Sequence, residues 1–403
     1  MQVSEDASAA LRKCVHCGFC LATCPTYQVL GDELDSPRGR LYLMKQVFEG
    51  KAPTATTQQH LDRCLTCRAC ETTCPSGVDY HVVLDAGRAA VDAQVERPLW
   101  VRLKLWVLRE LLPQRALFGA VVRLGRVFGW LLPGSLRRQL SVMPAQAGIQ
   151  SLEGTGSLLS QGGRVLLLQG CVQPALRPNI NAATTRVLAR LGFDAIEVPG
   201  AGCCGALRHH LDEHEDALDD ARLVIDEWWP HIFAGAKAIV VTASGCGAHV
   251  ADYGRLLRDD PDYADKAQRV SELLTDLADL IEPEAARLFA SARAAPAQPI
   301  AFQSPCTLQH GLRIRGTVER VLEAAGYQLT PVSDAHLCCG SAGTYSILQP
   351  ELSRRLRDDK LAALEAGKPA AIATANIGCQ THLAGGTTTP VHHWIELIEQ
   401  RLV

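Results

Sequence analysis

The sequence predicts a multidomain α+β protein, in which a mostly α-helical N-terminal domain precedes two α/β repeats with parallel sheets. Three observations predict this architecture. Two identical runs of cysteines fall near the N-terminus. A second cysteine pattern occurs twice after residue 164, and in both copies apolar runs of strand length alternate with helical segments. The length of 403 residues is enough for two to three such domains.

Eight of the sixteen cysteines form two runs with one spacing, Cys14-x2-Cys17-x2-Cys20-x3-Cys24-Pro25 and Cys64-x2-Cys67-x2-Cys70-x3-Cys74-Pro75. This is the spacing of a two-cluster bacterial ferredoxin, in which the fourth cysteine of each run ligates the other cluster. We therefore expect one [4Fe–4S] cluster on Cys14, Cys17, Cys20 and Cys74, and a second on Cys64, Cys67, Cys70 and Cys24. A zinc site would need two pairs of ligands, and a disulfide framework would need an exported chain.

The bulk properties narrow the class of protein further. The formal net charge of −3 argues against a nucleic-acid partner. No stretch of eighteen apolar residues lacks charges, so no transmembrane helix is expected. The first residues, MQVSEDASAA, have neither the basic nor the apolar region of a signal peptide. We expect a reducing, cytoplasmic compartment.

The other eight cysteines form an internal repeat built around the triplet Cys-Cys-Gly. The first copy contains Cys171, Cys203, Cys204 and Cys246, and the second contains Cys306, Cys338, Cys339 and Cys379. His249 and His382 each follow the last cysteine of their copy by three residues. Both copies read as the same α/β unit, so each cysteine should lie at or after the C-terminal end of a strand, where open sheets bind ligands.

These observations predict five segments along the chain. They are a two-cluster ferredoxin-type domain at 1–96, a basic amphipathic helical segment at 97–140, a linker at 141–163, and Cys-Cys-Gly repeats at 164–290 and 299–403. Three interpretations of the repeat cysteines remain open: buried free thiols, a zinc or redox-thiol site, or a further iron–sulfur site. His249 and His382 could add a ligand to such a metal site or be structural.

The basic segment has two interpretations. Residues 97–140 carry nine arginines or lysines and a single acid, Glu110. Tryptophans and phenylalanines alternate with these arginines over 98–132. An apolar, Trp-containing body with a cationic face is typical of a helix that lies on anionic lipid, which would make the protein peripheral on the inner face of the cell membrane. The alternative is a pair of helices, broken at Pro113, that packs on this chain or on a partner.

A shorter motif separates the two cysteine runs. Ser36-Pro37 is typical of the cap and first position of a helix, which should extend to about Phe48. Arg38 and Arg40 on this helix could reach a partner or a cluster sulfur, or lie on a solvated face.

The combined motifs resemble one family over nearly the whole chain. The segment Asp35–Arg40 (DSPRGR) and the stretches Pro305–Leu312 (PCTLQHGL), His336–Tyr345 (HLCCGSAGTY) and Thr374–Leu383 (TANIGCQTHL) resemble the iron–sulfur subunits of glycolate oxidase, also called glycolate dehydrogenase. Its wider relatives include lactate-utilisation proteins, the anaerobic glycerol-3-phosphate dehydrogenase C subunit and heterodisulfide reductase B subunits. The last of these have a fifth cysteine where this chain has His249 and His382, so their five-thiolate cluster is not implied here.

The resemblance implies an electron-transfer subunit that relays electrons from a flavin-binding glycolate dehydrogenase subunit to a quinone or another membrane acceptor. The alternatives are an equivalent subunit for lactate or glycerol-3-phosphate, or a thiol-active subunit like the heterodisulfide reductases. No residue of this chain is expected to oxidise the substrate. No flavin or NAD site is expected either, because Gly154-Thr-Gly156 lacks the third glycine of a dinucleotide-binding motif.

Overall fold

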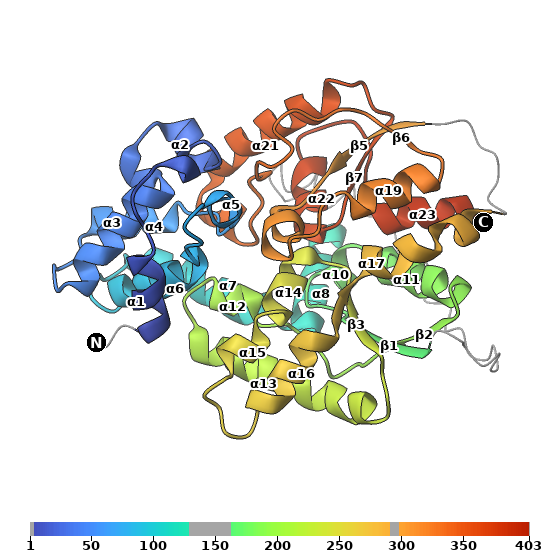
Figure 1. Cartoon of the computed structure of the whole chain (residues 1–403), viewed down its shortest axis with the longest axis horizontal. Helices are drawn as coiled ribbons and strands as arrows, with labels where there is room; N and C mark the ends of the chain where they lie inside the picture. The colour runs from blue at the N-terminus through green and yellow to red at the C-terminus, as the bar shows by residue number, and fades with distance from the viewer. Residues whose placement is uncertain (1–3, 129–162, 291–297, 403) are drawn as a thin grey trace.

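The computed structural model describes residues 4–128, 163–290 and 298–402. Within these ranges the chain forms a helical N-terminal part and two α/β units with parallel sheets, which confirms the predicted fold class (Figure 1). Of the predicted linker at 141–163 only the last residue is described, and residues 129–140 of the basic segment lie outside the described ranges. No helix in the described part of the chain is both long and apolar enough to span a bilayer.

The N-terminal part consists of short helices around a small core. They are α1 (Glu5–Arg12), α2 (Pro25–Leu30), α3 (Pro37–Phe48), α4 (Ala55–Asp62), α5 (Ala69–Thr73) and α6 (Tyr80–Asp92), with 3-10 turns at Phe19–Leu21 and Glu33–Asp35. Helix α3 begins where its sequence predicts, because the Ser36 side chain accepts a hydrogen bond from the Gly39 amide and Pro37 occupies the first position. Leu41 and Met44 of α3 pack with Leu84 of α6 in the core.

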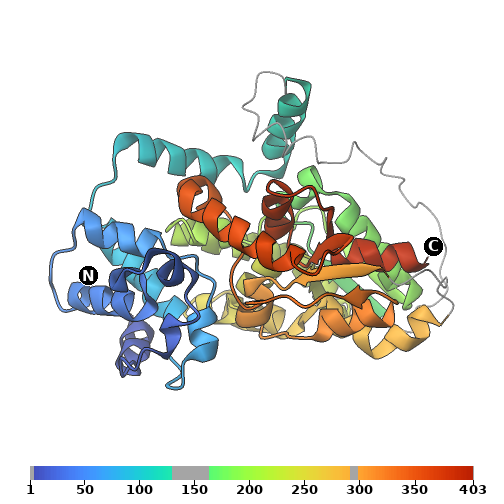
Figure 2. The same ribbon diagram turned by 90° about the horizontal axis from the view of Figure 1, so that it is seen from above.

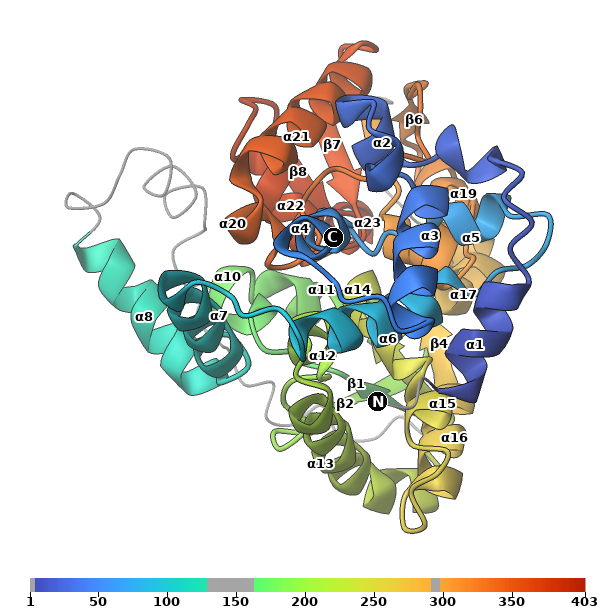
Figure 3. The same ribbon diagram turned by 90° about the vertical axis from the view of Figure 1, so that its left-hand side faces the viewer.

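Two helices follow and lie at the edge of the molecule, α7 (Leu99–Leu111) and α8 (Arg115–Val127) (Figures 2 and 3). The chain breaks between them at Pro113, which removes a backbone donor from any continuous helix. Leu105 and Leu108 of α7 pack on Leu211 of the first repeat, whereas other apolar side chains of both helices face solvent.

Each repeat contains a four-stranded parallel sheet. The first has the order β2-β1-β3-β4 and the second β6-β5-β7-β8, so the two topologies are identical. The strands are β1 (Gly163–Leu167), β2 (Phe193–Glu197), β3 (Ala238–Val241), β4 (Leu274–Asp276), β5 (Pro299–Gln303), β6 (Gln328–Leu329), β7 (Ala371–Thr374) and β8 (Val391–His393). Strand β3 and residues Val165–Leu167 of β1 are buried apolar runs paired in register, with Val165 opposite Ala238, as expected for a sheet covered on both faces.

Helices cover both sheets. In the first repeat they are α10 (Gln173–Leu176), α11 (Asn179–Arg190), α12 (Ala206–His209), α13 (His214–Phe233), α14 (Ser244–Val250), α15 (Tyr253–Leu256), α16 (Ala264–Leu273), α17 (Leu277–Ile281) and α18 (Ala285–Phe289), with a 3-10 turn at Glu282–Glu284. In the second they are a π-helical turn η5 (Thr307–Gly311), α19 (Thr317–Ala324), α20 (Tyr345–Leu348), α21 (Pro350–Glu365), α22 (Ile377–Ala384) and α23 (Trp394–Leu402).

The two repeats pack with approximate two-fold symmetry. The helix after the first strand of each repeat packs on the helix after the last strand of the other, so α11 contacts α23 and α19 contacts α17. One hydrophobic core is shared between them, with Val187 and Leu188 of α11 and Ile395 and Ile398 of α23 all buried. Figure 1 shows the second repeat (orange to red) above the first (green to yellow), with the N-terminal helices (blue) beside both.

Candidate iron–sulfur centres

The structure brings the cysteines of the two N-terminal runs together around two neighbouring cavities. Cys14, Cys17 and Cys20 line the first cavity together with Cys74 of the other run. The chain turns tightly here, since Gly18 has φ +86° between the second and third cysteines. Cys17 is exposed to solvent, and so are the neighbouring side chains of Val15 and Phe19.

The second cavity is lined by Cys64, Cys67 and Cys70 together with Cys24 of the first run. Cys24 is buried at the N-cap of α2, and Pro25 occupies the first helical position. Cys70 borders both cavities, which places the two sites side by side. Four thiols around each cavity are a donor set that suits a tetrahedral iron–sulfur cluster.

Burial holds three of these thiols, Cys20, Cys67 and Cys70, in their neutral form in the absence of a cation. It raises the pKa of Cys20 to about 11, and raises the pKa values of Cys67 and Cys70 well above the ordinary value. Four such groups at one cavity would repel each other as thiolates. Metal binding would supply the compensating positive charge and release their protons.

A buried ion-pair network supports the second cavity. Arg40 is 1% exposed and donates to the backbone oxygen of His60 at 2.7 Å, to Thr26 Oγ1 at 3.1 Å and to Asp35 Oδ1 at 3.2 Å. Thr26 Oγ1 in turn lies 3.3 Å from Cys24 Sγ. The solvated-face alternative is therefore wrong for Arg40. Arg38 is partly exposed and pairs with Glu33 at 2.8 Å.

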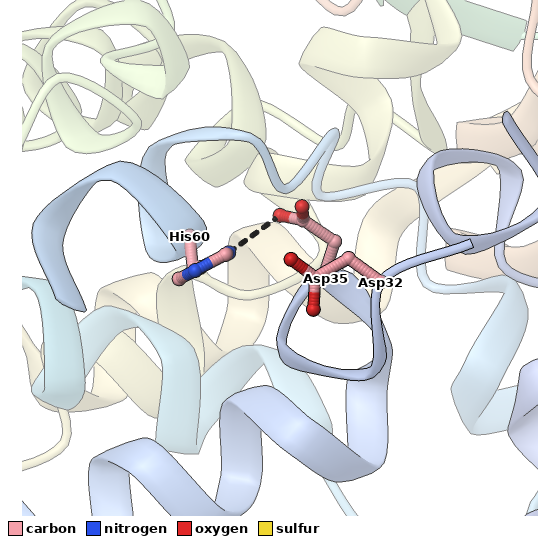
Figure 4. A group of neighbouring side chains, drawn as sticks. All are labelled: Asp32, Asp35 and His60. Atoms are coloured by element: carbon pink, nitrogen blue, oxygen red, sulfur yellow. Dashed lines mark ion pairs between the residues drawn. The ribbon is translucent and has the colours of Figure 1, made fainter. Parts of the chain in front are cut away.

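Asp35, with Asp32 and His60, resembles a cation site by composition (Figure 4). However, the fully buried Asp35 carboxylate already pairs with Arg40, with Arg63 at 2.9 Å and with His60 Nδ1 at 3.1 Å. Asp32 is exposed and caps the 3-10 turn by accepting from the Leu34 amide. These contacts satisfy the carboxylates without an ion, so the group is an ion-pair network.

The repeat cysteines also converge. In the second repeat Cys306 Sγ lies 3.8 Å from Cys338 Sγ; interaction with Cys338 lowers the pKa of Cys339, but Cys379 and burial raise it well above the ordinary value. In the first repeat the shifts in the pKa of Cys171, Cys203 and Cys204 likewise come first from neighbouring thiols of the same set, which includes Cys246. Interactions with Cys171 and Cys204 lower the pKa of Cys203, and the pKa values of those two thiols are raised.

The glycine of each triplet shapes the turn that presents the sulfurs. Gly205 and Gly340 have φ +85° and +84°, and their amides donate to Cys203 Sγ and Cys338 Sγ at 3.5 and 3.4 Å. A β-carbon at Gly340 would lie 2.6 Å from the backbone oxygen of Ser353. Both conformation and space therefore require glycine here.

The second N-terminal cavity adjoins the cysteine site of the second repeat. Cys67 packs against a small buried cluster that contains Cys306 and Cys338. Burial, followed by the negative charge of Cys306, raises the pKa of Cys67. A hydrogen bond of 2.8 Å between Thr72 Oγ1 and His310 Nδ1 joins the same two parts of the chain. The two N-terminal sites and the cysteine site of the second repeat thus adjoin one another, from exposed Cys17 to the interior.

Comparisons with known proteins agree with this arrangement. Residues 10–78 match the model of the 4Fe-4S dicluster domain, and residues 165–251 and 300–384 each match the cysteine-rich domain. The chain is 54% identical over 397 residues to the "Glycolate oxidase iron-sulfur subunit" of Escherichia coli (strain K12), covering 98% of this chain and 95% of that protein. The chain belongs to this family of iron–sulfur subunits.

More distant relatives are consistent with that membership. The "Probable glycolate oxidase iron-sulfur subunit" of Bacillus subtilis (strain 168) is 32% identical over 391 residues, covering 92% of this chain and 87% of that protein. "Lactate utilization protein A" of the same strain is 25% identical over 229 residues, covering 55% of this chain and 91% of that protein. The family membership and the dicluster domain make the chain an iron–sulfur electron-transfer subunit.

The two histidines after the last repeat cysteines have different surroundings. His382 Nε2 lies 3.2 Å from Ser353 Oγ, whose hydroxyl donates to the Gly340 carbonyl at 2.7 Å, so this histidine supports the Cys-Cys-Gly turn. His249 is buried, and its Nε2 has no hydrogen-bond partner among the described residues. Burial lowers the pKa of both, so both are neutral near pH 7. A structural role is favoured for His382, whereas His249 retains an open ring nitrogen.

Three further side chains contact the cysteines of the second N-terminal cavity and belong to no cysteine motif. Arg88 donates to the backbone oxygen of Cys64 at 3.0 Å, the Tyr80 hydroxyl lies 3.8 Å from Cys64 Sγ, and Thr26 contacts Cys24 as described above. One signal was available for Arg88, because it falls on the same helical face as Leu84 and Val91. An arginine within an apolar helical face indicates a buried cation with an internal partner.

Proposed function

We propose that this chain relays electrons within a glycolate dehydrogenase, from a separate flavin-binding subunit that oxidises glycolate to a quinone or another membrane acceptor. The observation that carries the proposal is the series of adjoining cysteine sites, which begins at an exposed surface and continues into the second repeat. Clusters held at these sites supply one-electron redox chemistry. The protein places the sites close together and excludes water from the inner ones.

We assign Cys14, Cys17, Cys20 and Cys74 to one [4Fe–4S] centre and Cys64, Cys67, Cys70 and Cys24 to the other. The crossed lining of the two cavities supports this assignment. At the repeats, four convergent thiols per site support a further iron–sulfur cluster or a zinc ion. The exposed surface at Cys17 and Phe19 is where we expect the flavoprotein to deliver electrons.

We also propose that α7 and α8 lie on an anionic membrane surface. Leu99, Leu103, Trp106 and Val107 share one face of α7 and are 40–79% exposed. Helix α8 exposes a similar row, Leu117, Val121, Leu124 and Val127. Helices α7 and α8 have six cationic side chains against the single acid Glu110, which favours anionic lipid over an acid-lined protein groove as the occupant.

Vesicle flotation tests the membrane proposal. Leu103→Glu should abolish co-flotation with vesicles of phosphatidylglycerol and phosphatidylethanolamine. Leu223→Glu is the matched control, since Leu223 is 51% exposed on α13 of the first repeat. Equal flotation of the two variants would show that this face does not bind lipid.

Anaerobic reconstitution tests the relay. The iron and sulfide contents of the purified chain are measured first. The chain is then mixed with glycolate, with and without the flavoprotein, and the loss of visible absorbance on cluster reduction is followed. We expect bleaching only with the flavoprotein, and faster with glycolate than with lactate or glycerol-3-phosphate. Oxidation of glycolate by the flavin-free chain alone would contradict the proposal, and a preference for lactate would reassign the substrate.

A further inference from the structure

A cavity of about 500 Å³ lies where the three parts of the chain meet. Its walls come from α4 and the Cys64–Thr66 loop, from the start of α7, from the His210–Asp212 turn of the first repeat and from residues 342–349 of the second. Cys64 itself is part of the wall. The volume is that of a small-molecule site, and it lies beside a proposed cluster ligand.

The polar groups of this cavity suit an oxygen-bearing ring. Arg88 is 8% exposed, lines the cavity, and keeps its Nε without a hydrogen-bond partner among the described residues. Lys104 and Thr344 also line it, so cationic and hydroxyl donors are available to carbonyl oxygens. Val101 and Leu105 supply an apolar wall for a ring face.

The cavity is continuous with the exposed face of α7. Trp100 is 68% exposed and lines the cavity, and it lies within one helical turn of Leu99 and Leu103 on the face proposed above to meet lipid. A ligand with a long apolar tail could therefore place its ring beside Cys64 and leave its tail along α7. A water-soluble acceptor has no apolar tail to place in the opening between the cavity and α7.

We propose that this cavity binds the ring of a membrane quinone and that the chain reduces the quinone there. The inference rests on the relay function proposed above and adds the site of its final step. Reduction converts the two C=O groups of the quinone to C–OH groups, using two electrons and two protons. The electrons arrive one at a time through the centre that Cys64 helps to hold, which is oxidised as the quinone is reduced.

Asp212 is placed to donate a proton. It lines the cavity in a left-handed turn with φ +64° and makes no side-chain hydrogen bond among the described residues. Burial, with help from Asp92 and Asp62 and against Arg88 and Arg97, raises the pKa of Asp212 to about 7. It is therefore partly protonated at neutral pH and can pass protons from solvent to a ring oxygen.

Photo-labelling with a short-chain azidoquinone tests the site without relying on turnover. The clustered holoprotein is irradiated with the probe, digested and mapped by mass spectrometry. We expect label on residues 97–105, 210–212 or 342–349. Gln59→Trp, which places a bulky side chain at the exposed rim, should reduce labelling at least tenfold, whereas Gln94→Trp, exposed but outside the lining, should not. Label elsewhere, or equal labelling of both variants, would overturn the inference.

Kinetics of the complex separate this site from the relay itself. Asp212→Asn should slow quinone reduction about tenfold or more, while reduction of ferricyanide, a one-electron acceptor that takes up no proton, stays unchanged. Asp216→Asn, exposed on α13, is the control. Glycolate-dependent ferricyanide reduction without any quinone reduction would overturn the quinone site and leave the relay intact. Failure of both acceptors in the wild-type complex would overturn the relay.

Discussion

Replacing Arg40 should lower the reduction potential of the centre proposed on Cys24, Cys64, Cys67 and Cys70. Burial alone would lower the pKa of Arg40, but the negative charges of Cys64, Tyr80, Cys24 and Asp35 outweigh it and raise the pKa. The guanidinium is therefore a permanent positive charge beside the cluster ligands. A cation at this position favours the reduced, more negative cluster.

The distance from the Arg40 guanidinium to Cys24 Sγ sets the size of the expected shift in reduction potential. Contacts of 3.1 Å from Arg40 Nη1 to Thr26 Oγ1 and of 3.3 Å from Thr26 Oγ1 to Cys24 Sγ place the guanidinium within about 6.4 Å of the sulfur. A unit charge at that distance, with an effective dielectric constant of 20, is worth about 2.6 kcal/mol. That corresponds to about 110 mV for one electron, so Arg40→Gln should lower the potential by about 50 to 110 mV after local relaxation.

The assay is a redox titration of each cluster followed by paramagnetic resonance. Arg40→Gln breaks a buried ion pair and should also cost about 3–5 kcal/mol of stability. Arg40→Lys keeps the charge, so it should keep the potential while losing stability, which separates electrostatics from misfolding. Arg38→Gln, two residues away but lining the first cavity, should leave this centre unchanged. A shift smaller than about 10 mV, or an increase, would refute the reasoning.

Three further outcomes are expected. Cys24→Ser should alter the resonance signal of the centre on the second cysteine run, and Cys74→Ser that of the first; the reverse pattern would refute crossed ligation. Gly340→Ala should cost at least about 3 kcal/mol in chemical denaturation because of its clash with Ser353, whereas Gly343→Ala, with positive φ and open space, should cost about 1–2 kcal/mol; equal losses would contradict the steric argument. Burial opposes the charge of His81, but the carboxylates of Asp252, 3.5 Å from Nε2, and of Glu71, 2.8 Å from Nδ1, outweigh it and raise its pKa to about 9. His81→Gln should therefore lose about 2 kcal/mol below pH 6.5, and this loss should fade as the pH rises through 9; a loss independent of pH would show that His81 acts uncharged.

Elements with strong local signals were predictable. The Ser36-Pro37 cap predicts the start of α3. The helical patterns over 179–191 and near 351–365 predict α11 (Asn179–Arg190) and α21 (Pro350–Glu365). Strands β4, β6 and β8 were not predicted, because two or three residues are too few to show a periodic pattern. Their existence depends on pairing with β3, β5 and β7, which is tertiary information.

The cysteine ligands of the candidate site could be predicted from their spacing, whereas the contacts that depend on domain packing could not. Arg40 shares the buried face of α3 with Leu41 and Met44, but a charged residue at such a position is ordinarily exposed, so local reasoning favours solvent. Its internal partner Asp35 lies only five positions earlier, so the pair itself offered a signal. The contact of Cys67 with Cys306 offered none, because it joins parts of the chain that only the folded arrangement brings together.

The two-fold arrangement of the repeats makes their cysteine sites unequal. A single N-terminal domain can face only one of two symmetry-related sites at close range. In the second repeat the pKa of Cys338 is shifted mainly by Cys306, Cys339 and burial. The charge of Cys67 raises it further. In the first repeat the groups that shift the pKa of Cys203 lie within that repeat, led by Cys171 and Cys204 and including Arg208. The second repeat is thus placed to exchange electrons with the N-terminal centres, while the first repeat contacts the second through α14 and η5, where Ser244 Oγ lies 2.7 Å from Thr307 Oγ1.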